Sequence, residues 1–249
     1  MKTSATKKLV FCYFECVFLR MSVCLLRRQR QMTLSNCRSL PIPVTGVSSP
    51  EQAETWLGKQ SETVRKVTKV YDSGMLVQCP FIEDGTYVDP TAQLIGGVIV
   101  RSGCYVGPFA IVRLDEKPSL EPLVIGQDSN IQDCAIVHST TQSIGSRVIV
   151  AHQAIVHGAV IEDDVTIYIQ AVADGDGTVI GQGSFLHQGS YVGKGIRVPN
   201  GRYVAPGVKV LTQNEADKLP AVPEALIAVR NHVLEHNRAH VATHRTEIR

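Results

Sequence analysis

Aliphatic residues recur at every sixth position through the middle of this chain. One unbroken series runs through Ile82, Val88, Leu94, Val100, Val106 and Val112, and another through Ile180, Leu186, Val192, Val198, Val204 and Val210. Between them lie two shorter series, at Ile125, Ile131 and Val137 and at Ile144, Val150 and Val156. An amphipathic α-helix has a period of about 3.6 residues, and a half-buried strand a period of about two. A fixed period of six is typical of a hexapeptide-repeat parallel β-helix, an all-β solenoid.

Length, charge and cysteine content narrow the classes of protein to consider. A chain of 249 residues is long enough to bury a large core in one elongated solenoid. The net charge of +2, with no dense basic face in the repeat, argues against nucleic acid as the main partner. Seven cysteines without regular spacing do not indicate a disulfide framework. Cys104 and Cys134, in neighbouring coils, are expected to be small buried core residues.

Before the repeat we expect two segments without a role in the solenoid. Residues 1–48 resemble an extension or a degenerate secretion signal, since Lys7 and Lys8 precede an apolar run over residues 9–19. That run is shorter than the ~20 residues of a membrane-spanning helix, so no stable membrane insertion and a cytoplasmic location are expected. Residues 49–72 are expected to form a helix and linker, with the helix over about residues 50–70 beginning at Ser49 and Pro50.

Two further segments complete the expected organisation. The β-helix domain is expected over residues 80–212 and a C-terminal helical segment over residues 213–249. Within that last segment, residues 213–219 indicate a short helical turn. From Glu224 onward the apolar residues follow a helical stripe, which predicts an α-helix packed along the outside of the solenoid.

The period also predicts which residues stack on one another. In a three-sided coil of about eighteen residues, positions one coil apart lie on adjacent strands. Val112, Ile131 and Val150 are nineteen residues apart, one coil with one inserted residue. Aligning the chain on these anchors predicts three stacked pairs: Arg113 with Gln132, Asp133 with His152, and His138 with His157.

The stacked histidines indicate a metal site. Adjacent strands lie ~4.8 Å apart, so His138 and His157 can bind one ion. His152 precedes His157 by five residues, or ~16 Å along a strand, so it would have to come from a neighbouring copy of the chain. Three such contacts close a ring, which predicts a homotrimer with interfacial sites. The alternative is that these are ordinary surface or core histidines.

Several charged and amide side chains lie within one coil of the histidines. Their arrangement is consistent with a catalytic site or with an interface salt-bridge network, and they are Arg113, Asp115, Glu116, Gln132 and Asp133.

The spaced motifs resemble those of the γ-class carbonic anhydrases. They are Arg113-Leu114-Asp115-Glu116, Asn130-Ile131-Gln132-Asp133, His138, Ala151-His152 and Val156-His157-Gly158, with the closing turns Asn200-Gly201-Arg202-Tyr203 and Asp217-Lys218-Leu219-Pro220. The resemblance covers roughly residues 80–220. The hexapeptide repeat by itself is unspecific, because acyltransferases share it, whereas the spaced motif set is much more specific.

The resemblance implies a left-handed β-helix homotrimer that hydrates CO2 to bicarbonate reversibly by a metal-bound hydroxide. The implied ion is Zn²⁺, with Fe²⁺ or Co²⁺ as alternatives, and the metal ligands are His138, His152 and His157. Gln132 matches the residue that orients the bound water or hydroxide. The remaining catalytic candidates are Asn130 near the substrate, Arg113 and Asp133 in the subunit-interface network, and Glu116 in proton transfer.

This chain departs from the family in places that bear on proton transfer. Members with the best-known proton shuttle carry an acidic loop after the first ligand, but residues 139–143 here contain no carboxylate. Asn237 aligns with a late family asparagine, while Glu235 occupies the position of its aromatic partner. Histidines without a family counterpart recur at every fourth position, at His232, His236, His240 and His244. This spacing places them in a stripe on one face of the helix, which is either a metal-binding or proton-transfer face or an ordinary solvated or packing face.

Two other functions remain open from the sequence. One is a hexapeptide acyltransferase that uses a coenzyme A thioester, with His187 as the general base. The other is a metal-bound scaffold subunit with little catalytic activity.

Overall fold

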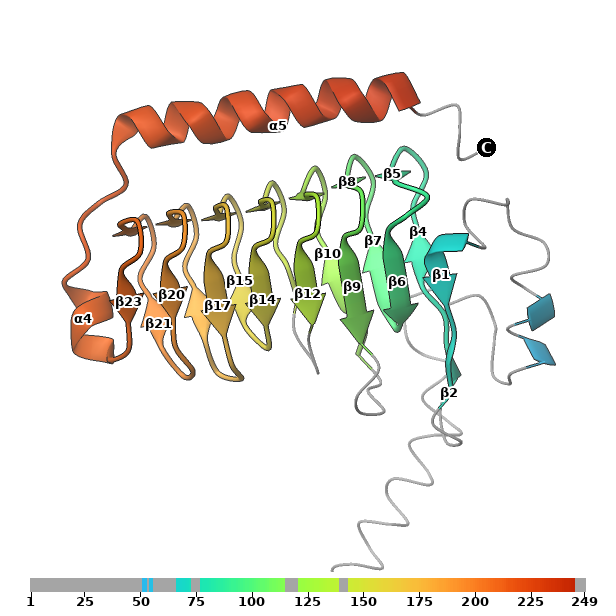
Figure 1. Cartoon of the computed structure of the whole chain (residues 1–249), viewed down its shortest axis with the longest axis horizontal. Coiled ribbons are helices and arrows are strands. Elements are labelled where there is room, and N and C mark those ends of the chain that lie inside the picture. The colour runs from blue at the N-terminus through green and yellow to red at the C-terminus, as the bar shows by residue number, and fades with distance from the viewer. Residues whose placement is uncertain are drawn as a thin grey trace, which may run out of the picture. The chain divides into compact units, whose positions relative to one another are not determined.

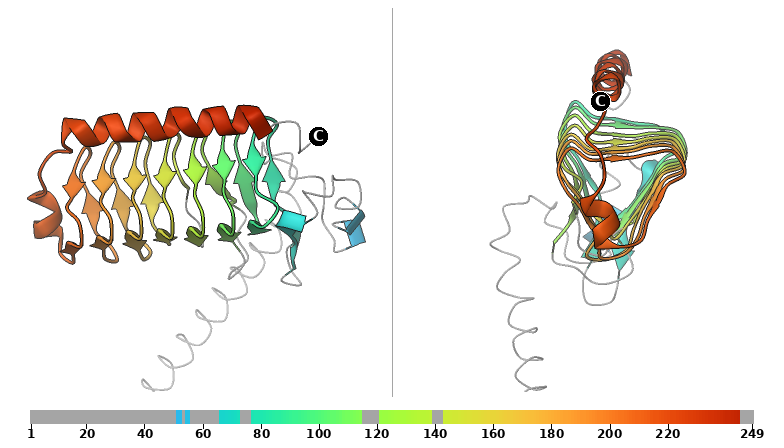
Figure 2. Two further views of the ribbon diagram at one scale, coloured as in Figure 1. Left: turned by 45° about the horizontal axis from the view of Figure 1, so that its top comes forward. Right: turned by 90° about the vertical axis from the view of Figure 1, so that its left-hand side faces the viewer.

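The chain forms a three-sided, left-handed parallel β-solenoid of about six turns, with a C-terminal helix alongside (Figures 1 and 2). The computed structural model describes residues 51–52, 54–55, 66–72, 77–114, 121–138 and 143–244. The hexapeptide solenoid expected from the period of six is therefore confirmed.

Two faces of the solenoid are long parallel sheets. The first, here called the histidine face, contains β1 (Thr68–Lys69), β6 (Gln93–Gly96), β9 (Ile111–Leu114), β12 (Ile136–His138), β14 (Ile155–His157), β17 (Val172–Asp174), β20 (Tyr191–Val192) and β23 (Lys209–Val210). The second, the helix face, contains β5 (Tyr87–Val88), β8 (Tyr105–Val106), β11 (Asn130–Ile131), β13 (Ile149–Val150), β16 (Thr166–Ile167), β19 (Phe185–Leu186) and β22 (Tyr203–Val204).

The third face consists of two three-stranded sheets. They are β4 (Phe81–Ile82), β7 (Val98–Val100) and β10 (Leu123–Ile125), followed by β15 (Val160–Ile161), β18 (Val179–Ile180) and β21 (Arg197–Val198). Single bridges from Ile144 to Ile125 and to Ile161 join the two sheets. Before the first coil, β2 (Tyr71–Asp72) and β3 (Val77–Gln78) pair antiparallel.

The sixth-position aliphatic residues fill the interior. Apart from the partly buried Ile82, every residue of these series is at most 2% exposed. Alternate side chains of a strand point to opposite faces, so each inward aliphatic leaves its strand neighbour outside. The core thus fixes which residues reach the surface.

Tight corners join the faces, and their backbones require special conformations. Asp128, Arg147 and Asp164 all have φ between 55° and 61° at equivalent corners of successive coils. At Gly126 a Cβ atom would lie 2.5 Å from the carbonyl carbon and oxygen of Gly145 in the next coil. The coils approach so closely there that no side chain fits.

One expected register is wrong. Arg113 pairs with His138, twenty-five residues later, and does not stack with Gln132. The same long coil separates Val100 from Ile125. The nineteen-residue spacing holds for Ile131 with Val150, but the coil before it contains the extra residues that follow β9, which moves Arg113 onto the strand beneath His138.

The two ends of the described chain correct one expectation and confirm another. The helix expected over about residues 50–70 has ended by β1, because Thr68 and Lys69 pair with β6. Residues 51–52 and 54–55 are helical, while residue 53 and residues 56–65 lie outside the described residues, as does the extension over residues 1–48. The expected helical turn is α4 (Gln213–Asp217), whose N-terminus Thr212 and Glu215 cap in a reciprocal capping box.

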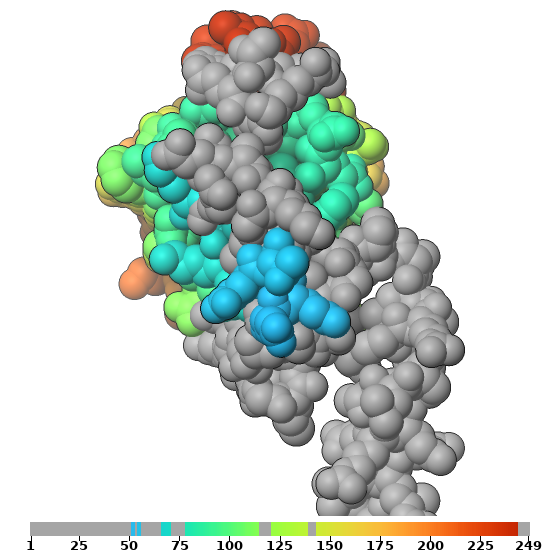
Figure 3. Space-filling model, turned by 90° about the vertical axis from the view of Figure 1, so that its right-hand side faces the viewer, coloured from blue at the N-terminus to red at the C-terminus, as the bar shows by residue number. Residues whose placement is uncertain are grey.

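The C-terminal helix α5 (Glu224–His244) runs along the solenoid, as expected, and contacts the helix face (Figure 2). Leu234 packs on Ile149 and Ala151 of that face. Figure 3 views the end of the solenoid at which the first coils lie, with α5 along its upper edge. Among the described helices none is long and apolar enough to cross a membrane.

Cys104 and Cys134, both expected in the core, differ in their exposure. Cys104 is fully buried as expected, and its Sγ lies 3.0 Å from the carbonyl oxygen of Gly126. Cys134 is exposed, so the expectation that it is a core residue is wrong. It has a φ of 59° at a corner, which turns its side chain away from the interior.

Candidate metal centre

The histidine face carries a row of four polar side chains, one from each of four successive coils. Arg113, His138, His157 and Asp174 are consecutive register partners on β9, β12, β14 and β17. Their strand neighbours Val112, Val137, Val156 and Ala173 are all buried, so the polar side chains of the row point outward. The stacked pair His138 and His157 expected from the sequence is present, with ring centroids 5.3 Å apart.

Asp174 orients the second histidine of this row. Its Oδ1 lies 2.8 Å from His157 Nδ1, and its Oδ2 accepts a hydrogen bond of 2.7 Å from the Tyr191 hydroxyl. The hydrogen bonds from Tyr191 and then from His157 hold the pKa of this carboxyl below its usual range. When Nδ1 of His157 donates to a carboxylate, Nε2 keeps its lone pair, which is the arrangement of a metal-binding imidazole.

His152 lies at a different place on the coil. It belongs to the sharp turn over residues 151–154 that joins β13 to β14, where Gln153 has a φ of 58°. Its Nδ1 lies 3.4 Å from Asp133 Oδ2 of the preceding coil, so the expected stack of Asp133 and His152 is present. The side chain of His152 is half exposed. Among the described residues of one chain, no three potential metal ligands come together.

Gln132 and Asn130 meet near the same corner on the helix face. Gln132 Nε2 donates a hydrogen bond of 3.0 Å to Asn130 Oδ1, and both side chains are buried. Asn130 Nδ2 has no hydrogen-bond partner among the described residues. The bond fixes the orientation of the Gln132 amide.

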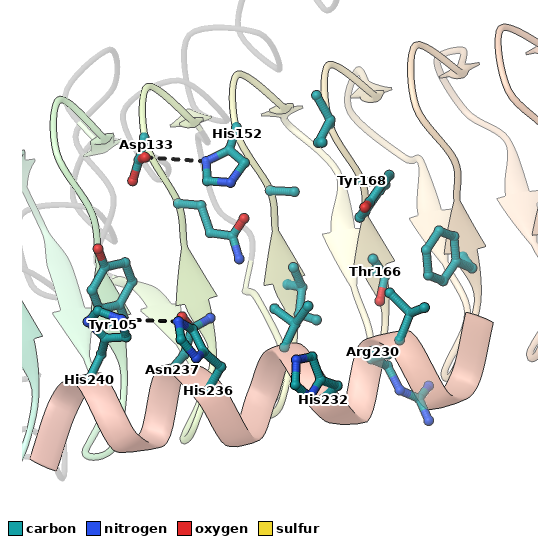
Figure 4. Close-up of a pocket in the computed structure, with 17 residues that line it drawn as sticks. Tyr105, Asp133, His152, Thr166, Tyr168, Arg230, His232, His236, Asn237 and His240 are labelled. Atoms are coloured by element: carbon teal, nitrogen blue, oxygen red, sulfur yellow. Dashed lines mark hydrogen bonds and ion pairs between the residues drawn. The ribbon is translucent and has the colours of Figure 1, made fainter. Parts of the chain in front are cut away.

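A pocket of about 420 Å³ lies between α5 and the helix face and extends to this corner (Figure 4). Gln132, Asp133 and His152 line it from the solenoid, and Asn237 lines it from α5. The family-like Asn237 therefore shares a pocket with Gln132 and His152. Glu235, in the same helix, does not line it.

The other candidate residues from the sequence lie apart from the histidine row or outside the described residues. Asp115, Glu116 and residues 139–142 are outside the described residues. His187 packs among Tyr168, Phe185 and Tyr203, where burial lowers its pKa. From the α5 stripe, His232, His236 and His240 line the pocket, while the side chain of His244 is not described.

Asp174 and Tyr191 were absent from the sequence candidates. Asp174 follows its inward anchor Ala173 by one, as His157 follows Val156. Its position one coil after His157 is the signal that could have found it, because a residue that follows an inward anchor by one must point outward. Tyr191 belongs to the next coil and reaches Asp174 through its hydroxyl.

The donor set suits a divalent ion that prefers imidazole. Adjacent stacked rings present two nitrogen donors from a rigid sheet, and Asp174 sets the orientation of one of them. Imidazole donors suit zinc and other first-row divalent ions. The side chains His138 and His157 can supply two ligands from one chain.

Comparison with known proteins agrees with the fold and gives a distant relationship. No protein-family profile matches the chain. A carnitine operon protein CaiE of Escherichia coli K12 is 36% identical over 104 residues, covering 41% of this chain and 50% of its own length. CaiE of Escherichia fergusonii is 37% identical over 96 residues, covering 37% of this chain and 47% of its own. The chain thus spans about half the length of these curated relatives.

Among solved structures, a hexapeptide transferase family protein from Anaplasma phagocytophilum superposes with a TM-score of 0.60. The match covers 72% of this chain and 98% of the other, at 22% sequence identity. At that identity the likeness shows the fold alone. This protein is a hexapeptide-repeat β-helix protein distantly related to CaiE.

Proposed function

We propose that the chain is a γ-class-like carbonic anhydrase, which hydrates CO2 reversibly at metal sites between the subunits of a homotrimer. The observation that carries the proposal is the stacked pair of His138 and His157, in which Nδ1 of His157 is hydrogen-bonded to Asp174. An isolated surface histidine needs no such orientation. Two imidazoles in register with a carboxylate behind one of them match the requirements of a metal-binding site.

The third ligand in this proposal is His152 of a neighbouring subunit. Within one chain His152 lies in the corner turn that joins β13 to β14, whereas His157 lies at the end of β14 on the histidine face. A neighbouring solenoid packed against that corner would bring its own His152 to the histidine face. The contact joins two different surfaces, and three such contacts close a ring.

The ion would supply one element of the chemistry: it lowers the pKa of a coordinated water to about 7, which makes hydroxide available at neutral pH. Gln132 would bind and orient the attacking oxygen, because Asn130 holds its amide in place. Asp133, 3.4 Å from His152 Nδ1, would fix the orientation of that ring. A proton must also leave the site, and Asp133 is the described carboxylate at the pocket edge.

The test measures CO2 hydration by stopped flow on anaerobically purified full-length protein, with metal content per chain and molar mass determined on the same sample. The proposal requires a trimer, about one ion per chain at the interfacial sites, and loss of hydration in His152→Ala. His232→Gln is the control, because it removes an imidazole outside the proposed ligand set. A monomer, or full hydration activity in His152→Ala, would contradict the proposal.

Mixed trimers test whether the ligands come from two chains. His152→Ala keeps His138 and His157, while His138→Ala keeps His152. Each variant alone should be inactive, but co-refolded equimolar mixtures should recover activity at about a quarter of their interfaces, because each mixed ring contains one intact site and rings of a single variant contain none. If the mixture stays inactive while each variant is trimeric, the ligands do not combine across subunits.

The same protein sample separates the two alternatives. Stabilisation by coenzyme A in a thermal-shift assay, abolished in His187→Gln, would favour the acyltransferase. A metal-loaded trimer without hydration activity would favour the scaffold.

A further inference from the structure

Two histidines of α5 approach each other in a way that the interfacial site does not explain. Nε2 of His236 lies 3.1 Å from Nε2 of His240, and their ring centroids are 4.7 Å apart (Figure 4). The residues are four positions apart, so one turn of the helix places them on the same face. Neither residue belongs to the proposed interfacial ligand set.

The separation of the two nitrogens matches a shared ion. Zinc binds imidazole nitrogen at ~2.0–2.1 Å, so two nitrogens on one tetrahedral ion lie about 3.3–3.4 Å apart, and on an octahedral ion about 2.9 Å. The observed 3.1 Å lies between these values. Two histidines at this helical spacing are also the arrangement used by zinc-binding helices.

Little rearrangement is needed to exchange the hydrogen bond for an ion. In the neutral pair one ring donates through Nε2 and the other accepts. An ion between the rings requires the donating ring to move its proton to its own Nδ1, after which both Nε2 lone pairs face the ion. No proton is released and the helix backbone does not change.

The surroundings leave space for the remaining ligands of such an ion. His236 and His240 line the pocket of about 420 Å³ between α5 and the solenoid. Asn237, next to His236 in the helix, has its Nδ2 buried in the wall of that pocket without a hydrogen-bond partner among the described residues. A polar group of this kind favours ordered water, and water can complete the coordination of an ion held by two imidazoles.

Neighbouring groups limit the movement of the pair and reduce repulsion of a cation. The ring of Tyr105 packs edge-on against His240, with centroids 6.0 Å apart, which supports that ring from the solenoid side. Arg238, the arginine between the two histidines in the sequence, has its guanidinium 3.4 Å from Asp128. The nearest helix cation in sequence is therefore paired with a carboxylate.

The geometry points to a second metal site within each subunit, in which His236 and His240 chelate one divalent first-row ion that prefers imidazole: Cu²⁺, Ni²⁺ or Zn²⁺. Of these three, Cu²⁺ is expected to bind most tightly. The site stands whether or not the chain hydrates CO2, because none of its ligands takes part in that reaction.

The experiment is a Ni²⁺ titration by calorimetry on full-length protein with alkylated thiols. In the His138→Ala, His157→Ala background, which lacks the proposed interfacial pair, one ion per chain should still bind. Adding His236→Gln or His240→Gln should weaken that binding at least about tenfold, the lower limit seen when even outer hydrogen-bond partners of a ligand are removed. His232→Gln is the matched control, one turn earlier on α5, and should leave the affinity unchanged.

A second measurement does not depend on the folding of the double variant. Cu²⁺ bound to the otherwise unsubstituted chain should give electron paramagnetic resonance signals of nitrogen-ligated copper, and His240→Gln should reduce the bound, nitrogen-ligated copper by about one ion per chain relative to His232→Gln. If His236→Gln and His240→Gln bind Ni²⁺ as tightly as His232→Gln does, and as much nitrogen-ligated copper, the site does not exist.

Discussion

His138 and His157 occupy paired positions on adjacent parallel strands, and their rings stack with centroids 5.3 Å apart. Arg113 precedes them in the same row and Asp174 follows them. The row therefore changes from a cation, through two imidazoles, to a carboxylate over four coils. Only one of the two imidazoles is next to the carboxylate, so the two rings are oriented by different neighbours.

Asp174→Asn should weaken Zn²⁺ binding by about 10–100-fold, the usual effect of removing the hydrogen-bond partner of a ligating histidine. The amide can no longer accept a charge-assisted bond from His157 Nδ1. Tyr191→Phe removes only the hydroxyl on the other side of the carboxylate and should have a smaller effect. Competition with a chromophoric chelator measures both, and equal affinities in all three proteins would show that Asp174 does not orient the ligand.

Gly126→Ala should destabilise the fold by about 1–3 kcal/mol, as overpacking of a tight interior does. The new Cβ would lie 2.5 Å from the backbone of Gly145, and neither coil can move away without losing its ladder of hydrogen bonds. Gly193→Ala is the control, because its nearest neighbours would be 3.5 Å or more from the new atom. Urea denaturation followed by circular dichroism compares the two, and the idea fails if both alanines are tolerated equally.

The pair of Arg147 and Asp164 should make stability depend on pH below about 4. Asp164 accepts bonds of 2.7 and 2.9 Å from Arg147, which holds the pKa of its carboxyl below the usual range. Since the unfolded pKa is ~3.9, the pair stabilises the folded chain above that pH, and this contribution is lost as pH falls through the lower folded value.

Comparison of Asp164→Asn with the parent measures this contribution. The difference in unfolding free energy between pH 7 and pH 3 should be smaller in the variant by about 0.5–1 kcal/mol, since both side chains are partly exposed. Asp84→Asn, at an exposed position, is the control. An unchanged pH dependence in Asp164→Asn would rule out this role.

Leu234→Ala should loosen α5 without unfolding the solenoid. Leu234 is 6% exposed against Ile149 and Ala151, and truncating a buried leucine costs about 2–5 kcal/mol. Ile227→Ala, at a position 36% exposed on the same helix, should cost far less. Hydrogen exchange should show faster exchange confined to residues 224–244 in Leu234→Ala, and uniform protection in that variant would argue against the contact.

Thiol labelling should distinguish the described cysteines. Burial raises the pKa of Cys104 to about 12 and that of Cys79 to about 11, so neither forms thiolate at neutral pH. Cys134 is exposed and should react with iodoacetamide in the native protein, as peptide mass mapping would show. Labelling of Cys104 before unfolding would mean that the coils around it open.

The period of six was enough to predict the solenoid and its interior. Each aliphatic position, such as Val137 or Val156, must face inward, and its neighbour must then face outward. The stack of His138 on His157 followed because the nineteen-residue spacing of Ile131 and Val150 also separates these two histidines. The position of Arg113 did not follow, because the long coil after β9 carries extra residues whose effect on register depends on which corner they occupy.

Local contacts between side chains were harder to predict than the backbone. The bond from Gln132 to Asn130 and the approach of His236 to His240 both depend on side-chain rotamers. The period of the solenoid contains no information on either. The stripe on α5 indicated which histidines share a face but not which two would meet.

The long coil after β9 has a consequence for how such a chain can change length. Each coil of a solenoid contacts only its neighbours, so a whole coil added or removed beyond Asp174 and Tyr191 would leave the four-residue row intact. A single residue added within β12 or β14, before its histidine, would turn that histidine inward, since alternate positions of a strand point to opposite sides. Variation in length is therefore compatible with the histidine pair only in whole coils or at a corner, and the segment after β9 shows the second solution.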